Sequence, residues 1–278
     1  MLSRTRQMRV IQKTCYLCDM ENIETKVIVL LIVATALMVL ERLFPKVRPL
    51  ASARLRTAVD RVLRVLKNAS LLLISAGLSP LVVIPLSAFA STHALGWRPD
   101  WWSGMTGLLI DIIILDCWIY WWHRANHEIP FLWRFHEVHH LDEFLDASSA
   151  FRFHFGEVML SAVVRAVVIW LLDIPLTSVV LFETLVLSMA LFHHSNVDLP
   201  KWLERPLSKV VVTPSLHWVH HHAIRADTDS NYANICSVWD VVFGSRSKTQ
   251  RWKDMPIGVE RRHDEGLIRL LMRPFKNH

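Results

Sequence analysis

Histidines at helical spacing are the residues of this chain best suited to chemistry. The chain has 15 histidines, and all except His93, His263 and His278 lie between residues 123 and 222. Residues at i, i+3 and i+4 share one face of a helix. Neutral imidazole is a common protein ligand for iron, zinc and copper. The clustering therefore predicts a metal site built on helices.

Three groups of histidines have this spacing. The first is an i, i+4 pair and the other two are i, i+3, i+4 triplets: His123 and His127, then His136, His139 and His140, and finally His217, His220 and His221. These are more imidazoles than one tetrahedral ion can use. We therefore expect two metal ions.

Four further histidines lie near these groups. We expect His154 and His194 to be ligands or close partners of ligands, because each lies between two of the groups. His222 directly follows the last triplet but points about 100° further round the helix, by helical geometry. The roles of His193 and His222 stay open.

Acidic and amide side chains near the groups could orient the imidazoles. A ligating histidine usually donates its second N–H to a carboxylate or a carbonyl. The candidates lie close to the histidines in sequence, and any one of them could equally be an ordinary surface group: Glu137, Glu157, Asp142, Asn196 and Asp240.

Other readings of the histidines compete with a two-metal site. The stretch His136 to His140 satisfies the HExxH pattern of zinc proteases, with Glu137 as general base. A protease needs one zinc with three ligands, however, which leaves the other two groups unexplained. A divalent-metal transporter would place its ligands near the bilayer midplane, and a haem protein does not need adjacent histidines.

The composition is that of a helical membrane protein. The chain is 52% hydrophobic with only 8 glycines, and it contains apolar stretches of bilayer length. We expect an all-α integral membrane protein with four or five transmembrane or hairpin segments and a histidine-rich helical cap. The segments are taken from five apolar runs: Val27 to Leu40, Asn68 to Trp97 (kinked by Pro80 and Pro85), Trp101 to Trp122, Val158 to Leu172, and Pro175 to Phe192, the last two forming a tight hairpin.

Basic residues lie beside these apolar runs. The net charge of +6 therefore indicates membrane-surface contact, not nucleic-acid binding. Residues 45–67 have the pattern of a basic amphipathic helix on anionic lipid. The positive-inside rule places this segment, the histidine groups and the basic tail on the cytoplasmic face. The basic residues before Val27 conflict with this topology, and either a re-entrant hairpin or a first apolar run that does not span would remove the conflict.

Three regions follow from this pattern. Residues 1–100 are an N-terminal membrane region, 101–250 a catalytic region and 251–278 a basic tail. Cys15 and Cys18 form a CxxC with no second pair after it, which is weak evidence for a redox pair or a metal site and favours ordinary thiols. Charges inside the apolar runs are costly unless paired, and we expect Arg165 to pair with Glu183.

The histidine groups resemble the signature of the fatty acid hydroxylase/sterol desaturase superfamily: HxxxH, HxxHH and a distal HxxHH on a membrane-helical scaffold. The resemblance runs from about Asp116 to Ser245 and includes Arg152-Phe-His154 with Glu157, His194-Ser-Asn196, and the stretch from Asn231 to Gly244. Two positions depart from it: Phe155, where many relatives have proline, and the additional His222.

This resemblance implies a di-iron centre that uses O2 and two reducing equivalents to hydroxylate or desaturate a lipid. Electrons would come from a separate partner, either ferredoxin-like or cytochrome b5-like with a reductase. The ligands implied are ten histidines: His123, His127, His136, His139, His140, His154, His194, His217, His220 and His221.

Overall fold

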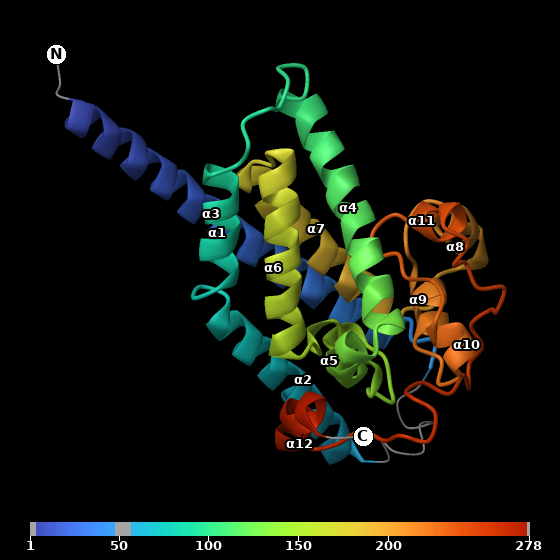
Figure 1. The fold of residues 1–278 in the computed structure, drawn as a ribbon. Helices are drawn as coiled ribbons and strands as arrows, with labels where there is room; N and C mark the ends of the chain where they lie inside the picture. The colour runs from blue at the N-terminus through green and yellow to red at the C-terminus, as the bar shows by residue number, and fades with distance from the viewer. Residues whose placement is uncertain (1–3, 48–56, 277–278) are drawn as a thin grey trace.

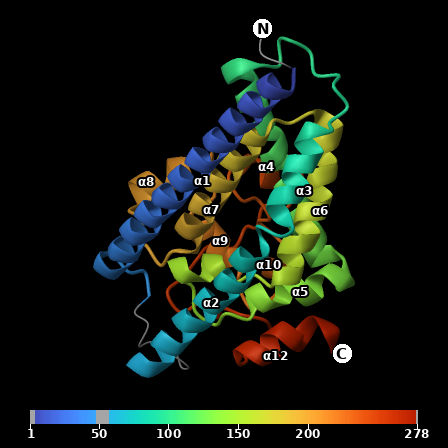
Figure 2. The same cartoon turned by 90° about the vertical axis from the view of Figure 1, so that its left-hand side faces the viewer.

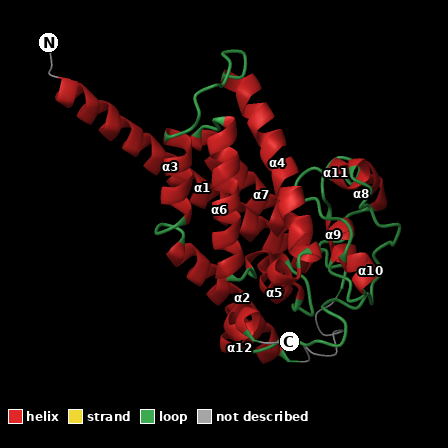
Figure 3. Ribbon diagram, viewed as in Figure 1, coloured by secondary structure: helices red, strands yellow, loops and turns green. Residues whose placement is uncertain are grey.

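The structure, a computed structural model, describes residues 4–47 and 57–276, with side chains from Glu24 onward. Within these residues the chain is helical, with isolated β-bridges and no extended strand (Figure 3). The expectation of an all-α fold is therefore confirmed. Cys15 and Cys18 lie among the residues whose side chains are not described.

A bundle of long helices forms one part of the molecule. Helices α3, α4, α6 and α7 run side by side, and α1 crosses the bundle against α7 (Figures 1 and 2). Their bounds are Arg4–Leu43 for α1, Val83–Thr92 for α3, Gly104–Glu128 for α4, Phe155–Leu172 for α6 and Leu176–His194 for α7.

Three of these helices, α4, α6 and α7, are long and apolar enough to cross a membrane. A fourth span exists if α2 (Ala58–Leu78) and α3 count as one, since they meet at a 43° bend. Pro80 lies in this break, as expected for a proline kink. Among the described residues α1 does not pass the same test, so three or four segments have the length and composition of a membrane span.

Helices α6 and α7 form the expected hairpin. The left-handed conformation of Asp173, with φ of 56°, ends α6, and α7 begins at Leu176. Across the hairpin the Arg165 guanidinium lies 2.8 Å from the Glu183 carboxylate, which confirms the expected pair. Lys26 of α1 donates to the same carboxylate at 2.5 Å, so this carboxylate links three helices.

The two buried aspartates of α4 also have polar partners. Asp111 accepts two hydrogen bonds from Arg98, at 2.8 and 3.0 Å. Asp116 accepts from the backbone N–H groups of Ile235 and Cys236, at 3.2 and 3.0 Å. Each buried charge therefore has hydrogen-bond donors around it, which offsets the cost of placing it in an apolar bundle.

Helix α2 begins later than the basic pattern of residues 45–67 predicted. A capping box between Thr57 and Asp60 fixes its first turn, and residues 48–56 lie outside the described part. Val59 and Leu63 are exposed, as expected for a face toward lipid, but Arg64 is buried against the cap. Arg64 is therefore not one of the lipid-facing cations.

Short helices make a cap that covers one end of the bundle and continues along the side of α4, where α8 and α11 lie (Figure 1). They are α5 (Pro130–His140), η2 (Ala147–Phe151), α8 (Lys201–Leu207), α9 (Pro214–His220), α10 (Arg225–Thr228), α11 (Val238–Val242), α12 (Leu267–Met272) and η3 (Arg273–Phe275). The last two belong to the expected basic tail, yet they fold back beneath α2 and α5 (Figure 2). Leu270 is fully buried there against Leu71 and Val138, because the tail also carries apolar residues at helical spacing.

Candidate metal centre

Four helices bring the histidines together. The last two turns of α4 carry the first pair, and α5 begins directly afterwards at Pro130, with His136 and His140 facing this pair. Helix α9 and the residue after it carry the last triplet, and α7 ends at His194. The rings face one another in the interior, and each is at most 6% exposed.

The histidines form two clusters, in each of which one ring nitrogen per residue lies within 4.8 Å of all the others. We call them the five-histidine cluster, with His123, His127, His136, His140 and His220, and the four-histidine cluster, with His139, His194, His217 and His221. Together they hold nine of the ten residues that the sequence indicated. The clusters adjoin, since the rings of His140 and His221 stack with centroids 4.3 Å apart.

The hydrogen bonds in the four-histidine cluster fix which nitrogens face inward. Nδ1–H of His139 donates to the Arg152 carbonyl at 3.2 Å, and Nδ1–H of His194 donates to the Ala190 carbonyl at 2.7 Å. A carbonyl can only accept, so in a neutral ring Nε2 carries the lone pair. The two Nε2 atoms lie 3.0 Å apart. Two lone pairs at this distance repel each other unless a cation lies beside them.

The five-histidine cluster has the same arrangement. Nδ1–H of His123 donates to the Tyr232 carbonyl at 2.7 Å, and Nδ1–H of His136 donates to Glu157 at 2.9 Å. Their Nε2 atoms face each other at 3.2 Å. His220 donates from Nδ1 to the Ser230 carbonyl at 2.7 Å, which leaves its buried Nε2 without a partner. Both clusters therefore present converging lone pairs.

Burial keeps these imidazoles neutral. Loss of solvation, and next the repulsion of neighbouring rings, hold the pKa of His139, His140, His217 and His221 well below the ordinary value. Burial also lowers the pKa of His220 to about 3. Both nitrogens of the His140 ring are buried without a hydrogen-bond partner. Buried polar atoms without a partner destabilise a fold. Metal ions bound to these ring nitrogens would remove that cost, so the two clusters of imidazoles fit metal ions.

The remaining histidines lie outside both clusters. His154, expected as a ligand, instead caps α6: its Nδ1 accepts from the Gly156 N–H at 2.9 Å and its Nε2–H donates to the Leu271 carbonyl at 3.1 Å. His222 donates to Asp227 at 2.7 Å. The ring of His193 lies 3.9 Å from that of His217 but joins neither cluster.

One of the five expected orienting side chains, Glu157, contacts a clustered histidine. The other four have different partners: Glu137 pairs with Arg262 and Arg273, Asp142 with Arg64, Asn196 with Val47, and Asp240 with Ala233 and Ser245. Four backbone carbonyls take their place, those of Arg152, Ala190, Ser230 and Tyr232. Every residue has a carbonyl, so the sequence carried no signal for these partners.

The position of Glu137 disfavours the zinc-protease interpretation. Its two carboxylate oxygens bind Arg262 and Arg273, with the second contact at 2.6 Å. A general base must reach the attacking water beside the zinc. This carboxylate is engaged by two guanidinium groups instead.

Comparisons with known proteins agree with the geometry. The Fatty acid hydroxylase family matches residues 108–245, which include both clusters. The chain is 28% identical over 196 residues to an ornithine lipid hydroxylase of Rhizobium tropici, covering 70% of this chain and 58% of that protein. It is 32% identical over 149 residues to the alkylglycerol monooxygenase of Danio rerio, covering 52% of this chain and 30% of that protein.

A plant protein is also similar. The chain is 24% identical over 161 residues to a very-long-chain aldehyde decarbonylase of Oryza sativa subsp. japonica, covering 55% of this chain and 25% of that protein. The chain thus spans less than two thirds of the length of these relatives. No solved structure matches the chain.

Proposed function

We propose a reaction for this chain on the premise that it belongs to the fatty acid hydroxylase superfamily. The chain is a lipid-oxidising membrane enzyme, and we propose that two iron ions, held by the two histidine clusters, are its cofactor. O2 is the co-substrate, and the product is a hydroxylated or desaturated lipid. The metal site lies on the cytoplasmic side of the membrane.

The main support for this proposal is that two clusters made only of histidines lie side by side. A transporter or a protease has no use for two adjacent sites with nine buried imidazoles between them. Zinc has no redox chemistry, whereas iron has it and is bound by imidazole. When bound, the two iron ions would supply the O2 and electron chemistry that oxidation of an unactivated C–H bond requires.

The residues of the chain hold and enclose this centre. The Nδ1 contacts of His123, His136, His139, His194 and His220 fix each ring so that its Nε2 faces a metal position. The buried rings exclude bulk water, which protects a reactive centre from side reactions. The long helices offer apolar surface to lipid, since only 28% of the most apolar stretch of α4 is buried, and this surface suits an enzyme whose substrate lies in the bilayer.

The relatives guide the choice of reaction. Two of them are named as a hydroxylase of ornithine lipid and a monooxygenase of alkylglycerol. We therefore propose hydroxylation of a lipid that carries a polar head group as the first reaction to test. The electrons come from a separate carrier, ferredoxin-like or cytochrome b5-like.

Two measurements test the function. Purified protein should contain about two irons per chain, which equals one ion per cluster. Lipid extracts of cells with and without the protein should differ by a species heavier by one oxygen. His139→Ala and His220→Ala, one from each cluster, should each abolish this product and lower the iron content. A protein that holds a single zinc, or both variants retaining full turnover, would reject the proposal.

A further inference from the structure

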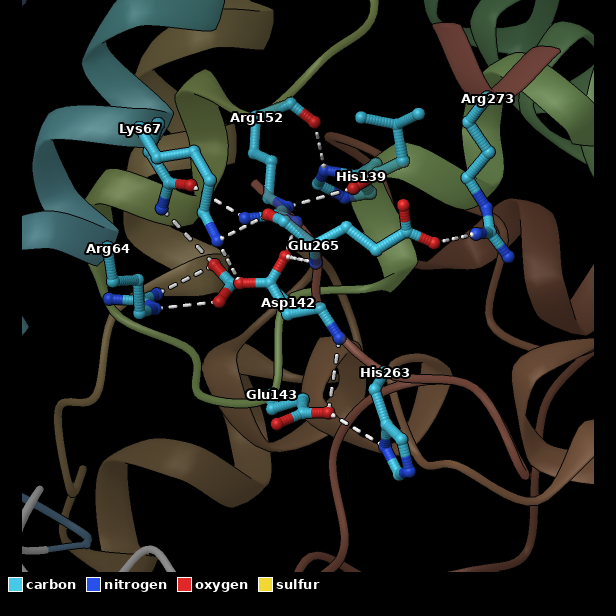
Figure 4. Close-up of polar contacts among 12 residues, drawn as sticks. Arg64, Lys67, His139, Asp142, Glu143, Arg152, His263, Glu265 and Arg273 are labelled. Carbon is cyan, nitrogen blue, oxygen red and sulfur yellow. Dashed lines mark hydrogen bonds and ion pairs between the residues drawn. The ribbon is translucent and has the colours of Figure 1, made fainter. Parts of the chain in front are cut away.

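We infer that Arg152 is a positioning residue for the four-histidine cluster and that Asp264, from the C-terminal segment, holds it in place. The inference rests on the proposed two-metal function. Figure 4 shows the starting contact, in which the carbonyl of Arg152 accepts the Nδ1–H of His139 at 3.2 Å. The direction of this carbonyl sets the tautomer and the orientation of the ring.

The Arg152 side chain is locked by three separate parts of the chain. Its Nε–H donates to the Val138 carbonyl on α5 at 2.8 Å, and its Nη1 donates to the Asn68 amide oxygen on α2 at 3.1 Å. Its Nη2 binds the carboxylate of Asp264. The side chain is fully buried, so water cannot replace a lost partner, and the backbone at this residue has little freedom.

The same contacts extend to the loop between the second histidine group and Arg152. Asp264 also binds Lys67 of α2. Asn68 donates to Asp142 at 3.2 Å, and Asp142 binds Arg64 through both carboxylate oxygens at 2.7 Å. Asp142 lies two residues after His140, so α2 and the C-terminal segment together hold both ends of this loop (Figure 4).

This network supplies an Nδ1 partner to one cluster and not to the other. The Nδ1 partners in the five-histidine cluster are the carbonyls of Tyr232 and Ser230 and the carboxylate of Glu157, and the Asp229 carboxylate lies 3.4 Å from Nδ1 of His127. None of these residues binds Arg152 or Asp264 in the described structure. Greater mobility of Arg152 should therefore weaken the binding of the metal ion in the four-histidine cluster, while the ion in the five-histidine cluster stays bound. A general loss of folding would release both ions together.

Metal retention in two variants tests the inference. Asp264→Asn removes the charge that Arg152 and Lys67 share, and Arg152→Lys keeps a cation but loses the three-pronged contact. Each should leave one iron bound as in the wild type and make the other about 10 to 100 times easier to remove with a graded chelator, the usual effect of losing a partner of a metal-ligating histidine. Asp198→Asn is the matched control, because Asp198 pairs with Lys46 at the surface.

Double variants identify which ion is weakened. After the same chelator treatment, the double variant Asp264→Asn/His221→Ala should retain as much iron as His221→Ala alone, because both changes act on the four-histidine cluster. The double variant Asp264→Asn/His127→Ala should retain almost no iron, because each change acts on a different cluster. The inference is overturned if the single variants keep both ions, or if they lose both to the same extent. Wild-type protein with fewer than two irons would instead reject the proposed function, and this inference with it.

Discussion

A hydrogen bond at Nδ1 decides what each clustered histidine can offer at Nε2. The most polar of these bonds joins His136 to Glu157, at 2.9 Å, in a buried position. A carboxylate partner raises the basicity of a ligating imidazole more than a carbonyl does. This contact therefore gives the five-histidine cluster one ligand of greater donor strength.

Glu157→Gln should weaken metal binding by the five-histidine cluster by about 10 to 100-fold. The side chain keeps its size and can still accept a hydrogen bond, but its negative charge is lost. Iron retention against a chelator measures the effect. Glu128→Gln, which removes the partner of Arg124 on the exposed side of α4, is the control and should retain both ions. Equal retention by the two variants would contradict the role of this carboxylate.

The depressed pKa values of the histidines predict how pH affects the metal-free protein. His140, His217, His220 and His221 resist protonation when folded, whereas in the unfolded chain they titrate near the ordinary 6.5. Between these values the unfolded state binds protons that the folded state does not. Its free energy of unfolding should therefore fall as pH falls below about 6.5, by up to about 1.4 kcal/mol per pH unit for each group.

Denaturation of chelator-stripped protein at pH 5 and at pH 7.5 checks this sign. The stability should be level above about pH 7 and clearly lower at pH 5, since protonation then favours the unfolded chain. Replacing His220 and His221 by asparagine should reduce the difference between the two pH values. A stability that does not change over this range would mean that the folded clusters accept protons as readily as the unfolded chain.

At the scale of helices, local patterns predicted the site better than its surroundings. Histidines on α4, α5 and α9 were predictable because a helix repeats every 3.6 residues, so their spacing alone places the rings on one face. The start of α2 at residue 58 and the folding of α12 under the cap were not predicted. These features depend on partners far away in the sequence, such as Asp142 for Arg64 and Leu71 for Leu270.

His154 illustrates the same limit. Its place between two histidine groups suggested a ligand, but a neighbour in sequence need not point into the same space. It occupies the N-cap of α6, where a side chain that accepts from the backbone satisfies a free N–H group. The sequence alone could not separate this capping role from a metal-binding role.

Close packing between α5 and α6 depends on Gly156. A Cβ atom there would lie 2.5 Å from Cε1 and 2.7 Å from Cδ1 of the Phe135 ring. This ring is itself enclosed by His154 and Phe275. Gly156→Ala should therefore lower the free energy of unfolding by about 1 to 3 kcal/mol, the usual cost of overpacking.

Thermal unfolding of the purified variant measures this cost. Gly266→Ala serves as the control, because a Cβ atom at Gly266 would meet no heavy atom within 4 Å. The control should unfold close to the wild-type temperature. If Gly156→Ala unfolds there too, α5 and α6 are less tightly packed than the structure shows.

Polar contacts connect the parts of the whole molecule. At the end of the bundle away from the cap, Arg98 binds Asp111 and also the carbonyl of Asp173, which joins the start of α4 to the α6–α7 turn. At the cap end, α2 and the C-terminal segment hold the loop that carries Asp142. The two histidine clusters therefore lie in a frame whose long helices are fixed at both ends, which suits the proposed site, since it needs nine rings in fixed positions.

Helix α1 is attached to this frame through Glu183. The carboxylate lies between Lys26 and Arg165, with all three side chains largely buried. Glu183→Gln leaves two cations without an anion in an apolar setting, and removing one partner of a buried ion pair is strongly destabilising. We expect a loss of about 3 kcal/mol in the free energy of unfolding, since estimates for such pairs are 3 to 5 and these groups are partly exposed.

A double-mutant cycle shows whether α1 contributes to this loss. Lys26→Met in the Glu183→Gln background removes one of the two uncompensated cations, so it should restore part of the stability, whereas Lys26→Met alone should lower it. This reversal of sign is expected only if the two side chains interact. If Lys26→Met is destabilising to the same degree in both backgrounds, α1 is held by its apolar contacts with α7, such as those of Leu37 and Leu191, and the carboxylate serves the α6–α7 hairpin alone.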